Sequence, residues 1–246
     1  MKADHAAQLR LLDLQAADTT LAQLAHRRAT LPELATLTAN EAAAAELTTQ
    51  IVDADTALAD IADEQRRLEN EVDVVRTRAT RDDQRLQSGG LPAKELESLQ
   101  HEITSLARRQ GVLEDELLEV MERREESESA LAELRRRHEG LTTEHDDLAG
   151  RRDEAFTEID RNAALKRTER ALIGNDIPAD LLALYEKARE HSGGVGAAML
   201  KARRCEGCRI ELSGSELSAV RTAEPDEVVR CENCRRILVR TDESGL

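Results

Sequence analysis

An apolar residue recurs at alternating steps of three and four from Leu37 to Ala79, and this spacing constrains the fold more than any other feature of the sequence. Eleven of its 13 positions are Ala, Leu, Ile or Val, and no proline or glycine occurs between Glu33 and Ser88. Such spacing places the apolar side chains on one narrow stripe of a helix, through which a second helix packs. The segment is therefore predicted to be one arm of a coiled coil.

A second series of the same spacing runs from Leu96 to Asn162, with 13 apolar residues among its 20 positions. The breaker sequence Ser88-Gly89-Gly90-Leu91-Pro92 separates the two series. Proline costs about 3 kcal/mol inside a helix. We therefore predict one antiparallel helical hairpin with its tip near residues 88–92. The alternative is a parallel dimer of continuous helices, which would be interrupted in both strands at the same level.

Proline and glycine also mark the ends of the hairpin. A shorter apolar series begins at Leu14, and its phase slips by one residue around Pro32, which predicts a kink or local unwinding there. The sequence from Gly174 to Pro178 stops the long helix. The residues that follow, through Ala188, have the spacing of a short helix in which Tyr185 is the expected packing anchor.

The composition excludes several classes of protein. The chain has 246 residues but one Phe, one Tyr and no Trp, and 35% of its residues are charged. A deep, closed substrate pocket is therefore not expected, and no catalytic triad, Walker motif or dinucleotide fingerprint is present. No run of about 18 apolar residues exists and the first residues lack the apolar stretch of a signal peptide. We expect a noncatalytic, cytoplasmic protein that does not enter a membrane.

The four cysteines form two C-x-x-C pairs, Cys205 with Cys208 and Cys231 with Cys234. In a reducing compartment such pairs are metal ligands or redox groups rather than structural disulfides. Two residues between cysteines let a tight turn aim both sulfurs at one ion, so two pairs complete a tetrahedral site. One structural Zn²⁺ is the predicted occupant. Iron in a site of four sulfurs is the main competitor, and a redox C-x-x-C would normally accompany a βαβ pattern, which this sequence lacks.

The sequence around the cysteines is typical of a zinc ribbon. Short strand-like pieces are predicted at 195–200, 210–212, 228–229 and 237–239, and Ser213 with Glu216 resembles a capping box at the start of a helical turn. A domain of about 50 residues without an aromatic side chain cannot bury enough apolar surface to fold on its own. Metal binding would supply the missing stability. Four thiolates also leave no position open for a substrate, so the metal is expected to be structural.

The predicted fold is mainly α, a long antiparallel helical-hairpin coiled coil followed by a small β-rich C4 zinc ribbon. Residues 1–173 are assigned to the hairpin, 174–194 to a connecting helix and linker, and 195–246 to the ribbon.

Charge indicates where a partner could bind. Residues 197–246 have nine Lys and Arg and nine Asp and Glu, so residues 1–196 carry the whole net charge of −15 and should repel nucleic acid. Six arginines lie near the cysteines in sequence: Arg203, Arg204, Arg209, Arg230, Arg235 and Arg236. They can offset the charge of the metal site or contact a partner. A protein partner is favoured, and RNA or DNA bound through these arginines is the alternative, although no aromatic residue is available for base stacking.

Other polar residues in the two arms are candidates for function. Lys94, Glu95, Gln100 and His101 lie just past the predicted tip, where a partner contact is possible and a simple helix start is the alternative. His138 and His145 fall on the apolar stripe seven residues apart. We interpret them as polar spacers that set the register rather than as a second metal site or a pH switch.

Two motifs carry a resemblance to a known family. The sequence from Lys94 to Ile103, KELESLQHEI, and the sequence from Cys231 to Val239, CENCRRILV, resemble the bacterial coiled-coil proteins that have a C-terminal C4-type zinc ribbon. The resemblance covers nearly the whole chain. It implies a helical hairpin followed by a zinc ribbon, and a regulatory adaptor that binds proteins or nucleic acid.

Together these observations predict a noncatalytic adaptor that binds a macromolecular partner, most simply a protein, through the ribbon and the coiled coil. A nucleic-acid-binding regulator that uses the ribbon arginines is the alternative. No small-molecule substrate is expected.

Overall fold

The computed structural model describes all 246 residues, which form two compact units, residues 1–34 with 149–246 and residues 35–148. The elements are α1 (His5–Ala29), α2 (Pro32–Ser88), α3 (Ala93–Asn175), α4 (Ala179–His191), β1 (Ala197–Lys201), β2 (Arg204–Cys205), α5 (Gly214–Thr222), β3 (Val229–Arg230) and β4 (Ile237–Val239). No helix is long and apolar enough to cross a membrane.

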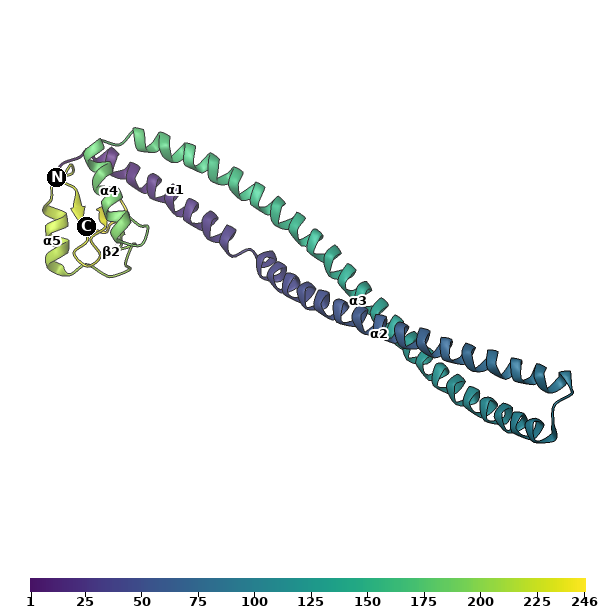
Figure 1. Ribbon diagram of the computed structural model, residues 1–246. Helices are drawn as coiled ribbons and strands as arrows, with labels where there is room; N and C mark the ends of the chain where they lie inside the picture. Colours follow the sequence, from purple (N-terminus) through teal and green to yellow (C-terminus); the bar gives the residue numbers. More distant parts are fainter. The chain divides into compact units, whose positions relative to one another are not determined.

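The unit of residues 35–148 is an antiparallel pair of helices made by α2 and α3 (Figure 1). Ion pairs join positions that approach the tip from both sides, such as Arg135 with Asp55 at 2.8 Å and Arg78 with Glu102. Gly89 and Gly90 turn the chain at the tip with φ of +70° and +82°, a region that other residues enter only at a cost. The predicted hairpin and its tip are therefore confirmed.

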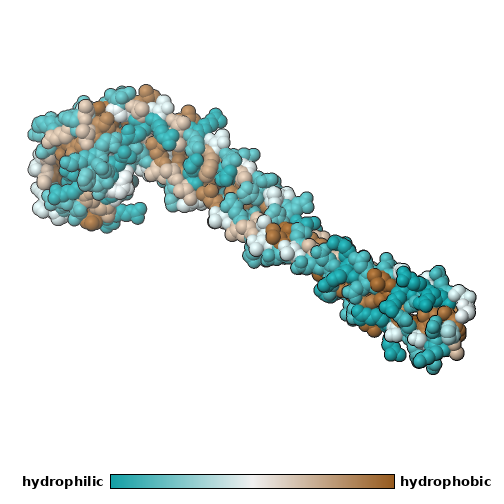
Figure 2. Space-filling model, viewed as in Figure 1, coloured by the Kyte–Doolittle hydropathy of each residue, from teal (hydrophilic) through white to brown (hydrophobic).

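The apolar stripe lies where the sequence predicts it along α2. All 13 positions of the series from Leu37 to Ala79 are buried or half-buried, and Leu37, Leu47 and Val72 are at most 5% exposed. The outer positions are mostly polar or charged, and Figure 2 accordingly shows a largely hydrophilic surface interrupted by small hydrophobic patches. Polar flanks and an apolar seam are the pattern that lets a long hairpin remain in water without a wide core.

The series in α3 holds with one exception. Asn162 is exposed, and Ala163 is buried in its place. Two successive steps of four residues, from Ala155 to Ile159 and on to Ala163, bring the buried stripe closer to the 3.6-residue period of a straight helix. The prediction of Asn162 as a seam residue is wrong because the strict alternation of three and four does not persist there.

In the other compact unit, α1 packs along the C-terminal part of α3. Arg28 pairs with Asp160 at 3.2 Å and Arg10 with Asp176 at 3.5 Å, so the antiparallel arrangement is kept. The chain leaves helical geometry between Ala29 and Pro32, which confirms the break predicted around Pro32. The predicted short helix is α4, and its Tyr185 is fully buried.

The strands form one small sheet in the order β2-β1-β4-β3. β1 and β4 are parallel, with Ala197 opposite Ile237, whereas β2 and β3 each pair antiparallel to a central strand. The predicted strand at 210–212 is wrong, since this segment makes only an isolated bridge between Glu211 and Arg204. The capping box of Ser213 and Glu216 is present at the start of α5.

The sheet shares a hydrophobic core with the helices of its unit. Leu11 and Leu14 of α1, Tyr185 of α4 and Ile237 of β4 are all completely buried in one cluster. Backbone hydrogen bonds from Ala3 N–H to Asp226 O at 2.7 Å and from Val228 N–H to Met1 O at 3.0 Å add the first residues to this unit. The ribbon is thus packed against α1 and α4, while the predicted domain boundaries at 173 and 194 stay a prediction.

A buried polar network joins the same helices. Asp18 of α1 has a side chain only 3% exposed, and it accepts hydrogen bonds from Arg170 of α3 at 2.7 Å and from the Tyr185 hydroxyl at 2.7 Å. Burial and the hydrogen bond to Asp18 raise the pKa of Tyr185, so this hydroxyl remains a donor. Gln15, one turn earlier, accepts a hydrogen bond from the N–H of Gly196 at 2.7 Å, beside the start of β1.

Candidate metal centre

The two C-x-x-C turns have the same backbone conformation. The Cys205 carbonyl accepts from Arg209 N–H at 2.6 Å, and the Cys231 carbonyl accepts from Arg235 N–H at 2.8 Å. Arg209 and Arg235 both have left-handed backbones, with φ of 61° and 64°. A residue other than glycine costs about 1–2 kcal/mol in this conformation. Each turn therefore tolerates local strain in order to bring its two sulfurs together.

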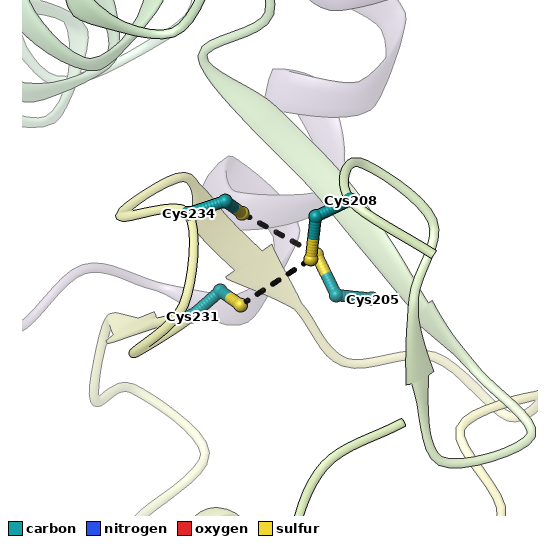
Figure 3. A group of neighbouring side chains, drawn as sticks. All are labelled: Cys205, Cys208, Cys231 and Cys234. Carbon is teal, nitrogen blue, oxygen red and sulfur yellow. Dashed lines mark hydrogen bonds between the residues drawn. The ribbon is translucent and has the colours of Figure 1, made fainter. Parts of the chain in front are cut away.

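The four sulfurs converge (Figure 3). Their Sγ atoms lie within 4.8 Å of one another, at 3.8 Å between Cys205 and Cys234 and 3.9 Å between Cys208 and Cys231. A Zn–S bond of about 2.3 Å in a tetrahedron requires sulfurs about 3.8 Å apart. All four cysteines are free thiols. The spacing fits one tetrahedral metal ion.

Electrostatics differ among the four thiols. Burial raises the pKa of Cys205 to about 12, against the lowering effect of the N–H groups of Cys208 and Gly207, which point at its sulfur. Burial also raises the pKa of Cys231. At Cys234 burial is outweighed, mainly by the N–H of Arg236, and the pKa falls to about 7. The turns thus supply N–H groups that stabilise thiolates, and a metal ion would supply the remaining positive charge.

Four cysteine ligands fill a tetrahedral shell. Zinc sites of this kind are structural, whereas catalytic zinc retains a position for water or substrate. Among side chains that can ligate metals, these cysteines are the one group of three or more whose donor atoms converge. His138 lies 3.3 Å from Thr48 Oγ1 and His145 lies 3.5 Å from Glu41, contacts that suit the interpretation as polar spacers.

The six ribbon arginines have different roles in the structure. Arg236 donates to the carbonyls of Ser192, Val195 and Gly207 at 2.7 to 3.1 Å, so it holds the linker against the first cysteine turn. Three others also have partners. Arg203 donates to Gly245 O, Arg204 pairs with Glu211, and Arg230 donates to Arg235 O.

Only Arg209 and Arg235 of the six have exposed side chains without a hydrogen bond or ion pair. They follow the second cysteine of each turn, at equivalent positions. The sequence predicts all six arginines as partner contacts. In the structure, these two are the most free to contact a partner, and that role stays a prediction.

The tip residues belong to the other compact unit, where they lie on the first turns of α3. Lys94, Glu95, Gln100 and His101 are all exposed, and their side chains make no hydrogen bond or ion pair within the chain. A role in binding stays a prediction for them as well.

Sequence reasoning missed Arg240. Its guanidinium donates to Ala223 O at 2.7 Å and to Glu227 O at 3.0 Å, and to three further carbonyls near the end of α5. The sequence signal for this role is an arginine directly after a buried strand. The side chain of such a residue begins at the edge of the core, where its guanidinium can donate to nearby backbone carbonyls.

The fold and this centre define a class of protein, a helical hairpin followed by a C4 zinc ribbon. The family model of the CT398-like coiled coil hairpin domain matches residues 14–193, and that of the C4-type zinc ribbon domain matches residues 204–238. The chain belongs to the CT398-like coiled-coil hairpin family, and its metal site is that of one Zn²⁺, which the ribbon match favours over iron.

Relatives share the whole architecture. A protein of Mycobacterium tuberculosis strain H37Rv, described as uncharacterised, is 39% identical over 98% of both chains. A solved structure from Mycobacterium smegmatis is 40% identical, with a TM-score of 0.86 over 98% of this chain and 100% of that one. The structure of CT398 from Chlamydia trachomatis has a TM-score of 0.70 at 18% identity, over 96% and 98% of the two chains, and supports the fold alone.

Proposed function

We propose that this protein is a noncatalytic, cytoplasmic adaptor that binds a protein partner through its zinc ribbon and its helical hairpin. The observation that carries the proposal is the closed four-cysteine centre, whose sulfurs lie within 4.8 Å of one another. A metal held by four thiolates has no position for a substrate, so its use is to shape the surface around it.

That surface has two features suited to recognition. Arg209 and Arg235 extend from equivalent positions of the two cysteine turns without partners in the chain. Both residues have left-handed backbones, a conformation that strains arginine more than glycine. An arginine kept at such a position, with its side chain exposed, favours a functional role for that side chain. Arginine is also enriched at the centres of protein interfaces.

The test compares partner capture by the zinc-loaded full chain with capture by an Arg209→Glu, Arg235→Glu variant. An Arg67→Glu, Arg221→Glu variant is the matched control, because it changes the net charge equally at exposed arginines that do not belong to the cysteine turns. We expect a saturable protein partner that the first variant loses and the control retains. Equal capture by both variants would remove the ribbon from the proposal.

The alternative is a regulator that binds RNA or DNA. The exposed arginines of the ribbon favour it, since Arg203, Arg204 and Arg230 lie near the same turns. Binding of this kind weakens steeply with salt, by roughly one power of the salt concentration for each phosphate contact. Titration of a labelled single-stranded RNA at low and high salt distinguishes the two functions, and no binding at low salt would reject the alternative.

A further inference from the structure

A groove runs along α2 near the tip of the hairpin, within the unit of residues 35–148. It extends from Asn70 to Arg85 and is bounded on one side by Glu102 of α3. At about 1.5 Å per residue this part of α2 is roughly 22 Å long, enough for four turns of a second helix.

The groove is less acidic than the chain as a whole. The residues that line it include three arginines and three acids, so their formal charges cancel, whereas the whole chain carries −15. An anionic partner is therefore repelled less at the groove than along most of the hairpin.

The groove contains positive charge that the chain does not neutralise. Each acid that lines it already has an arginine, because Asp73 pairs with Arg76 at 4.0 Å, and Asp82 and Glu102 both pair with Arg78. Arg81 and Arg85, which line the same groove, are exposed and have no carboxylate partner. They lie four residues apart, so both guanidinium groups are on one face of α2.

Two more side chains indicate what kind of surface fits. Val74 is 68% exposed and lies seven residues before Arg81, on the same face, which adds an apolar contact. Asp82 occupies the seam position after Ala79 and is 6% exposed, and its Oδ2 pairs with Arg78 Nε at 3.9 Å, so its charge is balanced within the hairpin.

We propose that this groove docks an acidic amphipathic helix of a protein partner. In an antiparallel arrangement, two carboxylates four residues apart meet Arg85 and Arg81, and an apolar residue seven positions further on meets Val74. A nucleic acid fits less well, because its continuous phosphates would also face Asp73 and Glu102, and no aromatic residue lines the groove for base stacking. The inference rests on the proposed function, because it takes the partner to be a protein. To that function it adds a second binding site, in the hairpin, and the chemistry of the segment that binds there.

The probe is a labelled helical peptide of about five turns with Glu four residues apart and Leu seven positions beyond, titrated into the zinc-loaded full chain. A peptide with Lys in place of each Glu is its counterpart, and a single-stranded RNA is the third ligand. The test variant is Arg81→Glu, Arg85→Glu. The matched control is Arg67→Glu, Arg151→Glu, which changes the net charge equally at exposed arginines outside the groove. Far-UV circular dichroism verifies that both variants keep the hairpin.

We expect salt-sensitive binding of the Glu peptide, weakened about tenfold or more by the groove variant, which corresponds to about 1.4 kcal/mol, and unchanged by the control. No binding of the Glu peptide, or equal weakening by both variants, would overturn the inference. RNA binding that is lost in the groove variant would reassign the groove to phosphates. If the groove variant still captures the ribbon's protein partner, the adaptor function stands independently of this site.

Discussion

The substitution Asp18→Ala tests whether the buried polar network holds the hairpin helices and the ribbon together. Asp18 is 3% exposed at its side chain and accepts from both Arg170 and Tyr185. Removing one partner of a buried ion pair typically costs about 3–5 kcal/mol. Arg170 keeps Glu186 as a partner and is 24% exposed, and Tyr185 keeps Gln15. We therefore expect the low end, a loss of about 3 kcal/mol.

The assay uses the single tyrosine of the chain, which lies in this unit and has no tryptophan to mask it. Urea unfolding is followed by Tyr185 fluorescence and, in parallel, by release of zinc to a coloured chelator. Asp13→Ala is the control, because Asp13 is in the same helix and pairs only with Arg10 at the surface. An exposed pair of this kind contributes about 0–1 kcal/mol. A loss at Asp18 no larger than that at Asp13 would refute the reasoning.

Three further predictions concern the metal centre. Cys205→Ser should abolish stoichiometric zinc binding and alter the Tyr185 fluorescence. Most of the far-UV helicity should remain, because α2 and most of α3 pack without the ribbon. Elemental analysis measures the zinc and circular dichroism the helicity. Arg235→Gly should raise the free energy of unfolding by about 0.5–1 kcal/mol, since glycine relieves the left-handed backbone; a lower denaturation midpoint would contradict it. In the metal-free protein, the pKa of Cys205 is raised from 9.0 to about 12, so the folded state binds the thiol proton more tightly than the unfolded state does. The stability that this difference contributes is fully present below pH 9 and should be lost as the pH rises from 9.0 toward 12. Zinc-loaded protein should show the opposite trend, losing metal as the pH falls; thermal melts across both ranges test the pair.

The long-range order of the hairpin could be predicted because its determinants are local. Leu37, Leu47 and Val72 recur at the spacing of one helical stripe, and Gly89 and Gly90 mark the reversal. The cysteine turns were predictable for the same reason, since four residues suffice to specify each. Asn162 shows the limit of this reasoning, because a change in the helical phase depends on the neighbouring helix and leaves no separate sign in the sequence.

The packing of α1 and α4 on the ribbon could not be predicted in this way. Gln15 looks like an ordinary surface residue of an amphipathic helix, yet the residue is only 8% exposed and its side chain accepts a hydrogen bond from the N–H of Gly196. Gly196 itself has no room for a methyl group, because an added Cβ would lie 2.6 Å from the Tyr185 carbonyl oxygen. Contacts of this kind join residues far apart in the chain, so no periodic pattern announces them.

The hydrogen bonds between the first residues and the ribbon also have a consequence for the order of folding. Lys2 and Asp226 are 224 positions apart, and Gln8 and Pro225 are 217 apart. Closing such long loops is entropically costly, whereas the tip of the hairpin closes over a few residues. During synthesis, α2 and α3 can therefore pair from the tip outward, whereas residues 1–8 gain their contacts with the ribbon only after residues 225–228 have been made. The segment that precedes the hairpin in the chain would thus become fully ordered after it, together with the zinc centre.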